Sequence, residues 1–169
     1  MNLYAVDKLI AQARRLAADY RRATGKSLPI SGEIAVHDAC SLLGLEACDN
    51  PNAGYDAMGH GEREGKRLQV KGRVIFNEAK SGQRIGQLKL EQSWDSVLLV
   101  LMNADFETEE IYEAEREVIL EALESAGNSA RKKRGAISVS RFKHIASLVW
   151  SQDEGVVSNE IWDNQASVP

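Results

Sequence analysis

A continuous apolar run, SVLLVLM at residues 96–102, constrains the fold more than any other feature of the sequence. The run is far too short for a membrane span, which needs about 20 apolar residues, and its length suits a β-strand. A strand without polar alternation must be covered on both faces, so we expect it near the centre of a sheet. The chain has 169 residues, 43% of them apolar and 27% charged, which is enough to bury one such core.

Four segments show the three- and four-residue apolar spacing that is typical of helices. Ser31 and Ser140 stand at expected N-caps, and Gly44 stands where a helix C-terminus is expected. The last helix is expected to run through Phe142 and Val149. The expected ranges of the four helices are 3–24, 31–44, 114–125 and 140–150.

The remaining segments predict a small sheet. Leu68 and Val70 alternate with Gln69 and Lys71, as on a strand with two different faces. The expected strands are 55–58 and 66–76, joined as a hairpin, then 96–102, then an edge strand at 109–113. Residues 77–93 are expected as a loop, and the acidic tail 151–169 as poorly ordered. We therefore expect one α/β (α+β) domain over residues 1–150, with a mixed sheet of about four strands flanked by helices.

Charge is unevenly distributed along the chain, although the net charge is only −4. Residues 66–89 carry seven basic side chains against one acid, and residues 131–144 carry six against none. Residues 105–124 carry nine acids against one arginine. This distribution predicts a basic face and an acidic face, and a basic face suits a polyanion such as DNA. The candidate nucleic-acid-binding residues are Arg73, Lys80, Arg84 and Lys89.

Three residues of the expected hairpin could carry chemistry: Asp56 on its first strand, and Gln69 and Lys71 on its second. Residues two apart on a strand share a face, and a hairpin brings Asp56 beside them. Mg²⁺ prefers oxygen ligands, which the Asp56 carboxylate, the Gln69 amide and the Val70 main-chain carbonyl could supply. A nearby lysine can orient or activate a water molecule, so the group predicts metal-assisted hydrolysis of a phosphodiester.

These residues resemble a known signature. GYDA at 54–57 followed by LQVKGR at 68–73 is similar to the PD-(D/E)xK restriction-endonuclease-like superfamily, in the QxK form of Mrr-type enzymes. The resemblance implies a restriction-endonuclease-like core over about 31–124, with Asp56, Gln69 and Lys71 as catalytic residues and Mg²⁺ or Mn²⁺ as cofactor. It further implies that Glu33, on the helix before the core, joins the metal site. Glu33 shares a helical stripe with apolar residues, so we expect it to face inward.

The predicted function is that of a metal-dependent DNA endonuclease in which Asp56 and Glu33 bind Mg²⁺ and Lys71 orients or activates the water. Gln69 stands where the superfamily pattern has an acid, so a second interpretation stays open. In it, the same fold binds nucleic acid or a protein without cleaving a bond. The whole chain is also similar to an uncharacterised family of small bacterial domains, which implies no activity.

Cys40 and Cys48 are too few for a disulfide framework and fit a reducing compartment. No secretory signal or membrane span is evident in the sequence, so a cytoplasmic protein is expected. DNA is the expected partner, a homodimer is compatible with the sequence, and no membrane association is expected.

Overall fold

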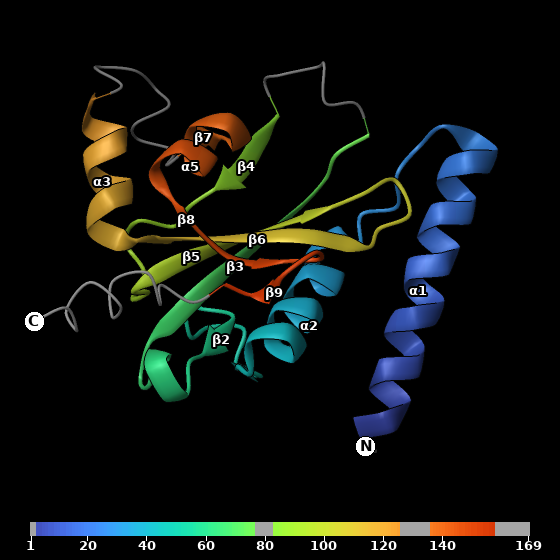
Figure 1. The fold of residues 1–169 in the computed structure, drawn as a ribbon, viewed down its shortest axis with the longest axis horizontal. Coiled ribbons are helices and arrows are strands. Elements are labelled where there is room, and N and C mark those ends of the chain that lie inside the picture. The colour runs from blue at the N-terminus through green and yellow to red at the C-terminus, as the bar shows by residue number, and fades with distance from the viewer. Residues whose placement is uncertain (1–2, 77–82, 126–135, 158–169) are drawn as a thin grey trace, which may run out of the picture.

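The computed structural model describes residues 3–76, 83–125 and 136–157, which form an α+β fold around a mixed sheet (Figure 1). The sheet has seven strands in the order β1-β2-β3-β5-β6-β8-β9, and β4 pairs with β7 in a separate two-stranded sheet. The helices are α1 (Leu3–Thr24), α2 (Ser31–Leu43), the short 3₁₀ helix η1 (Gly61–Arg63), α3 (Arg116–Ser125) and α5 (Val139–Ile145). The strands are β1 (Glu46–Ala47), β2 (Ala57–Met58), β3 (Arg67–Val74), β4 (Arg84–Gln87), β5 (Ser96–Met102), β6 (Thr108–Glu115), β7 (Ala136–Ser138), β8 (Ser147–Ser151) and β9 (Gly155–Val156).

Strand β5 occupies the centre of the sheet, as the apolar run predicts, and all seven of its residues are buried. It runs parallel to β3 and antiparallel to β6. Leu98 and Val100 face the core between the sheet and α2. Val97 and Leu99 face a second core, between the sheet and the layer of β4, β7, α3 and α5. The sheet is therefore covered on both faces, with α2 below it and the β4–β7 pair and α5 above it in Figure 1.

Strand β3 separates two environments along its length. Leu68 and Val70 lie in the core between the sheet and α2. Gly72 lies so close to this helix that an added Cβ would come within 2.6 Å of the Ala35 Cβ. Because side chains alternate along a strand, Gln69 and Lys71 point to the other side. The expected division of this strand into two faces is confirmed.

Helix α1 covers the predicted range and is attached to the sheet layer through a partly buried polar group. Arg14 donates to both carboxylate oxygens of Asp38, over 3.0 and 2.7 Å, and Thr108 donates its hydroxyl to the same carboxylate over 2.6 Å. Ala17 and Ala18 complete the buried side of the helix. Although α1 is long, no helix among the described residues combines the length and the apolarity that a membrane crossing requires.

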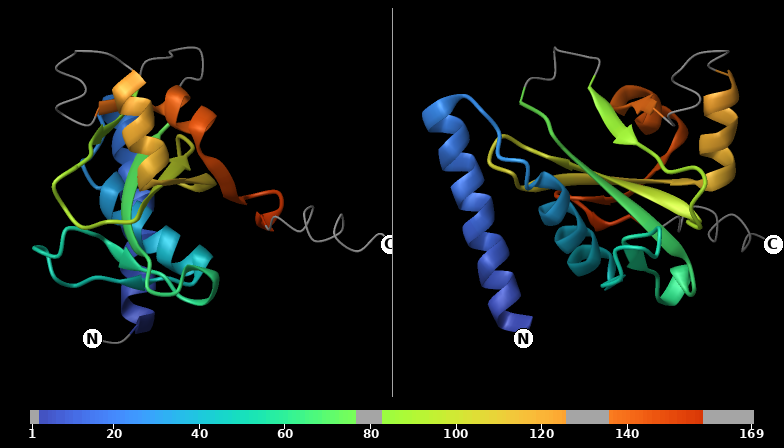
Figure 2. Two further views of the ribbon diagram at one scale, coloured as in Figure 1. Left: turned by 90° about the vertical axis from the view of Figure 1, so that its left-hand side faces the viewer. Right: turned by 180° about the vertical axis from the view of Figure 1, so that it is seen from behind.

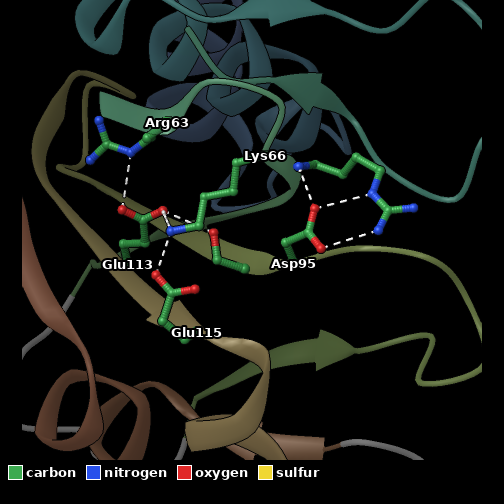
Figure 3. Close-up of polar contacts among 7 residues, drawn as sticks. Arg63, Lys66, Asp95, Glu113 and Glu115 are labelled. Carbon is green, nitrogen blue, oxygen red and sulfur yellow. Dashed lines mark hydrogen bonds and ion pairs between the residues drawn. The ribbon is translucent and has the colours of Figure 1, made fainter. Parts of the chain in front are cut away.

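An ion-pair network holds the beginnings of β3 and β5 against the end of β6 (Figure 3). The Glu113 carboxylate accepts hydrogen bonds from Arg63 at 3.0 Å and Ser96 at 2.8 Å, and Lys66 lies between Glu113 and Glu115. Arg67 forms a bidentate ion pair with Asp95: its Nε and Nη2 each donate to a carboxylate oxygen over 3.1 Å (Figure 3). Two cations of the basic segment 66–89 are thus paired with carboxylates of this chain.

Several expectations about the sheet are wrong. It has seven strands rather than about four, and β6 is an internal strand between β5 and β8 rather than an edge. Residues 140–150 form two elements: α5 ends at Ile145, and β8 follows as a strand paired with β6. Strand β4 lies in the expected loop, and β9 lies in the expected disordered tail. The rest of that tail, residues 158–169, lies outside the described part of the chain.

Two expected helix caps are also wrong. Ser31 is the first residue of α2, with Ile30 at the N-cap and no side-chain hydrogen bond there. In α5, Ser138 rather than Ser140 is the cap, because its hydroxyl accepts from the Arg141 N–H over 3.1 Å. Gly44 ends α2 in the left-handed conformation, as predicted.

Candidate active site

The candidate site lies where strand β2 begins, beside the middle of β3. β2 pairs with β3 only through Ala57 and Met58, opposite Leu68 and Arg67. Just before β2, the Asp56 N–H donates to the Leu68 carbonyl over 2.8 Å, and the Asp56 Oδ2 accepts from the Val70 N–H over 2.8 Å. The carboxylate therefore occupies the place of the next strand residue along the edge of β3.

The main-chain carbonyl of Val70 lies on the same edge. The N–H and C=O of one strand residue point in the same direction, and the Val70 N–H points at Asp56. The carbonyl oxygen of Val70 is consequently directed to the side that holds the Asp56 carboxylate. Two kinds of oxygen that bind hard cations are thus brought together at the end of the β2–β3 hairpin.

Gln69 is a polar residue in the middle of β3 and is only 5% exposed. Glutamine is uncommon at such a buried position. Its Nε2 donates to the Gly54 carbonyl over a long 3.4 Å, and its Oε1 is buried without a hydrogen-bond partner among the described residues. Leaving a buried acceptor unsatisfied costs about 1–3 kcal/mol. The fold thus keeps an amide oxygen whose partner is not supplied by the described residues around it.

Asp56, Gln69 and Lys71 line one pocket of about 170 Å³, so the structure brings these three residues to one place. Lys89, which follows β4, contributes a second amine to the same pocket. In the described part of the chain, the lining holds one carboxylate and two lysines, so the pocket is net basic. The other lining residues are Cys48, Asn50, Pro51, Gly54, Tyr55 and Gln92.

The electrostatics of the pocket act on Lys71. Burial lowers the pKa of its amine, the Asp56 carboxylate opposes that change, and the cations Arg73 and Lys89 lower the pKa further. The proton of this lysine is held less tightly than that of a solvated lysine.

On the other side of the strand, burial raises the pKa of the Cys40 thiol to about 11, and the Asp56 charge adds to that increase.

Glu33 differs from expectation. It lies in the first turn of α2, its side chain is exposed, and the described lining of the pocket does not include it. Helix α2 covers the sheet face opposite to Gln69 and Lys71. The prediction that Glu33 faces inward is therefore wrong, because α2 buries the neighbouring side of the helix, which begins with Ile34 and Ala35.

The candidate nucleic-acid-binding residues are placed differently from one another. Lys89 lines the pocket, and Arg84 is exposed on β4. Arg73 is half-buried and donates to the carbonyls of Arg84 and Gly72 over 2.5 and 2.6 Å, so it ties β4 to β3. Lys80 lies outside the described residues, as do the four basic residues at 131–134.

Sequence reasoning missed the loop that closes the pocket, residues 48–54, together with Gln92. Gly54 has φ +84°, and a Cβ there would lie 3.0 Å from the Gln92 Cβ. This position therefore requires glycine for both its backbone angle and its space. Gly54 was visible in the GYDA motif, but its contact with Gln92 is set by tertiary structure.

A comparison with protein-family models and a search of curated proteins both give no match for this chain. Within the described ranges, no group of three or more His, Cys, Asp or Glu side chains could hold a metal ion. Any cation at this site would depend on amide and main-chain oxygens beside the Asp56 carboxylate.

Proposed function

We propose that this protein is a Mg²⁺-dependent nuclease that hydrolyses phosphodiester bonds in DNA, with a restriction-endonuclease-like core of the PD-(D/E)xK superfamily in its QxK form. One observation carries the proposal: the buried Gln69 Oε1 lacks a hydrogen-bond partner among described residues, and Gln69 lines a pocket together with Asp56 and Lys71. The site combines an unsatisfied acceptor, a carboxylate and an amine with a lowered pKa. The unsatisfied acceptor lowers the stability of the fold, and titratable groups with shifted pKa values are typical of catalytic sites.

The residues fit a hard cation. Asp56, Gln69 and the Val70 carbonyl offer three oxygens, and Mg²⁺ or Mn²⁺ would complete its six-fold shell with water and substrate. When bound, the cation would supply Lewis-acid stabilisation of the scissile phosphate. Glu33 has no part in this proposal, because its side chain is exposed on α2.

The two lysines take separate roles. Lys71 is adjacent to the oxygen ligands along β3, and its lowered pKa suits it to orient the attacking water and to accept a proton from it. Lys89 is exposed at the pocket, where its charge can hold the phosphate and offset the negative charge that grows in the transition state. Asp56 keeps the hairpin edge in place through its bond with the Val70 N–H.

A second function, DNA binding without cleavage, is favoured by one specific observation. The described pocket lining carries two lysines against a single carboxylate, a balance that suits a phosphate. The same basic pocket would then hold the DNA backbone without hydrolysing it. Binding of the metal separates this alternative from the nuclease.

The test is a cleavage assay on single- and double-stranded DNA, with Mg²⁺ or with a chelator. We expect Mg²⁺-dependent cleavage that Lys71→Ala abolishes and that the matched control Lys26→Ala, an exposed loop residue, leaves unchanged. Calorimetric titration with Mn²⁺ completes the design. DNA binding without cleavage and without Mn²⁺ binding would replace the nuclease with the binding module, and no binding of either would refute both.

A further inference from the structure

Two helices, α1 and α3, each carry exposed large apolar side chains. Of the six large apolar side chains that are exposed in the described residues, two lie on α1 and two on α3. Leu9 and Leu16 are 57% and 61% exposed, and Val118 and Leu120 are each 37% exposed. Exposed apolar side chains that recur on one helix face can form part of an interaction site when charges of one sign accompany them.

The face of α1 is apolar and basic. Leu9 and Leu16 are seven residues apart, so they lie on one face about 10 Å apart along the axis. Lys8 and Arg15 have the same spacing, each directly before one of the leucines, and both are exposed. Each leucine is therefore accompanied by a positive charge on the solvent side of the helix.

The face of α3 is apolar and acidic. Glu117, Glu121 and Glu124 recur at steps of four and three, which places them on one exposed stripe. Val118 and Leu120 flank the stripe, one on each side, while Ile119 and Leu123 point into the core. The surface of α3 thus has the same combination of features as that of α1, with the opposite charge.

The two helices lie at opposite ends of the molecule, as Figure 1 and the rear view in Figure 2 both show. The two faces therefore cannot meet within one copy. We propose that they meet between copies: α1 of one molecule packs against α3 of the next, with the leucines against Leu120 on one side of the glutamate stripe. Lys8 and Arg15 then lie opposite the glutamate stripe.

Charge complementarity selects this arrangement over symmetric pairing. Pairing α1 with α1 would bring basic stripes together, and pairing α3 with α3 would bring acidic stripes together, and like charges in an interface are costly. A contact between two different surfaces of identical chains is heterologous, so it repeats from copy to copy and gives either a closed ring or an open chain.

Sedimentation velocity on two charge-reversed variants tests the proposal. Lys8→Glu with Arg15→Glu makes the α1 face acidic, and Glu117→Lys with Glu121→Lys makes the α3 face basic. All four positions are exposed, and circular dichroism checks that both variants fold. We expect wild type to self-associate as concentration rises, and each variant alone to associate at least about tenfold more weakly, since about 1.4 kcal/mol corresponds to tenfold.

The decisive experiment mixes the two variants. The acidic α1 of one variant then complements the basic α3 of the other, and the unaltered faces complement each other too, so association should return to the wild-type level. An α3-reversed variant that associates as strongly as wild type would overturn the proposal in favour of α1 pairing. Wild type that stays monomeric at all concentrations, or variants whose mixture does not associate, would also overturn it.

Discussion

Replacing Gln69 with leucine should stabilise the metal-free protein and abolish its binding of a divalent cation. The reason is the buried Oε1, which no described residue satisfies. Leucine has a similar size, removes that acceptor and suits the buried position in β3. A residue whose replacement increases stability is then one that is kept for the site rather than for the fold.

The magnitude follows from two opposing effects. Removing an unsatisfied buried acceptor returns about 1–3 kcal/mol. The substitution also removes the Nε2 bond to the Gly54 carbonyl, but at 3.4 Å this bond is long, and Gly54 lies at the pocket where water can replace it. A bond of this kind contributes at most about 0.5–1 kcal/mol. We therefore expect a net gain of about 1 kcal/mol, or about 2–4 °C in Tm for a chain of this size.

Urea unfolding measures this difference, first with EDTA and then with saturating Mn²⁺. A ligand at a hundred times its Kd adds about 2.7 kcal/mol to the protein that binds it. Wild type should therefore become the more stable of the two proteins when the metal is present. Gln87→Leu, at an exposed position on β4, is the control and should stay within about 0.5 kcal/mol of wild type in both conditions. A Gln69→Leu protein that is less stable than wild type in EDTA would refute the reasoning.

Four further outcomes are expected. Gln69→Glu should tighten Mn²⁺ binding and Asp56→Ala should abolish it, as measured by calorimetry. Asp38→Ala should cost about 2–4 kcal/mol in urea unfolding, because it leaves the Arg14 and Thr108 donors without their acceptor. Iodoacetamide should alkylate Cys40 at pH 8 at least about tenfold more slowly than a thiol of pKa 9.0, because a pKa of about 11 leaves a much smaller thiolate fraction; mass spectrometry gives the rate. Lys89→Ala should weaken DNA binding and reduce the salt slope by about 0.7–0.9, and an unchanged slope would place the DNA elsewhere.

The sequence predicted those elements whose pattern is long or unambiguous. Helix α1 and strand β5 have the expected bounds, because 22 residues of helical spacing and seven consecutive apolar residues each permit one interpretation. β8 was assigned to a helix because Phe142, Ile145 and Val149 also have helical spacing. Pairing with β6, which no local pattern reveals, makes this segment a strand.

The candidate site was predictable where a strand pattern defined it. Gln69 and Lys71 share a face because of their two-residue spacing, and the hairpin brings Asp56 to them. Glu33 could not be placed in this way. A helical wheel shows which residues share a side of a helix but not which of two neighbouring sides packs on the sheet. α2 buries the side of Ile34 and Ala35, and this leaves Glu33 exposed. The contribution of Lys89 depends on the path of the chain after β4, which no local pattern determines.

The alternation along β3 has a consequence for how this protein can change in evolution. One set of residues on this strand, Leu68 and Val70, packs in the core between the sheet and α2. The alternate set, Gln69 and Lys71, lines the pocket. Inserting or deleting a single residue between Arg67 and Gln69 would exchange the two sets, so that Lys71 would enter the apolar layer and Val70 the pocket. A lineage of this protein can therefore alter its pocket by substitution, while β3 itself must keep its length.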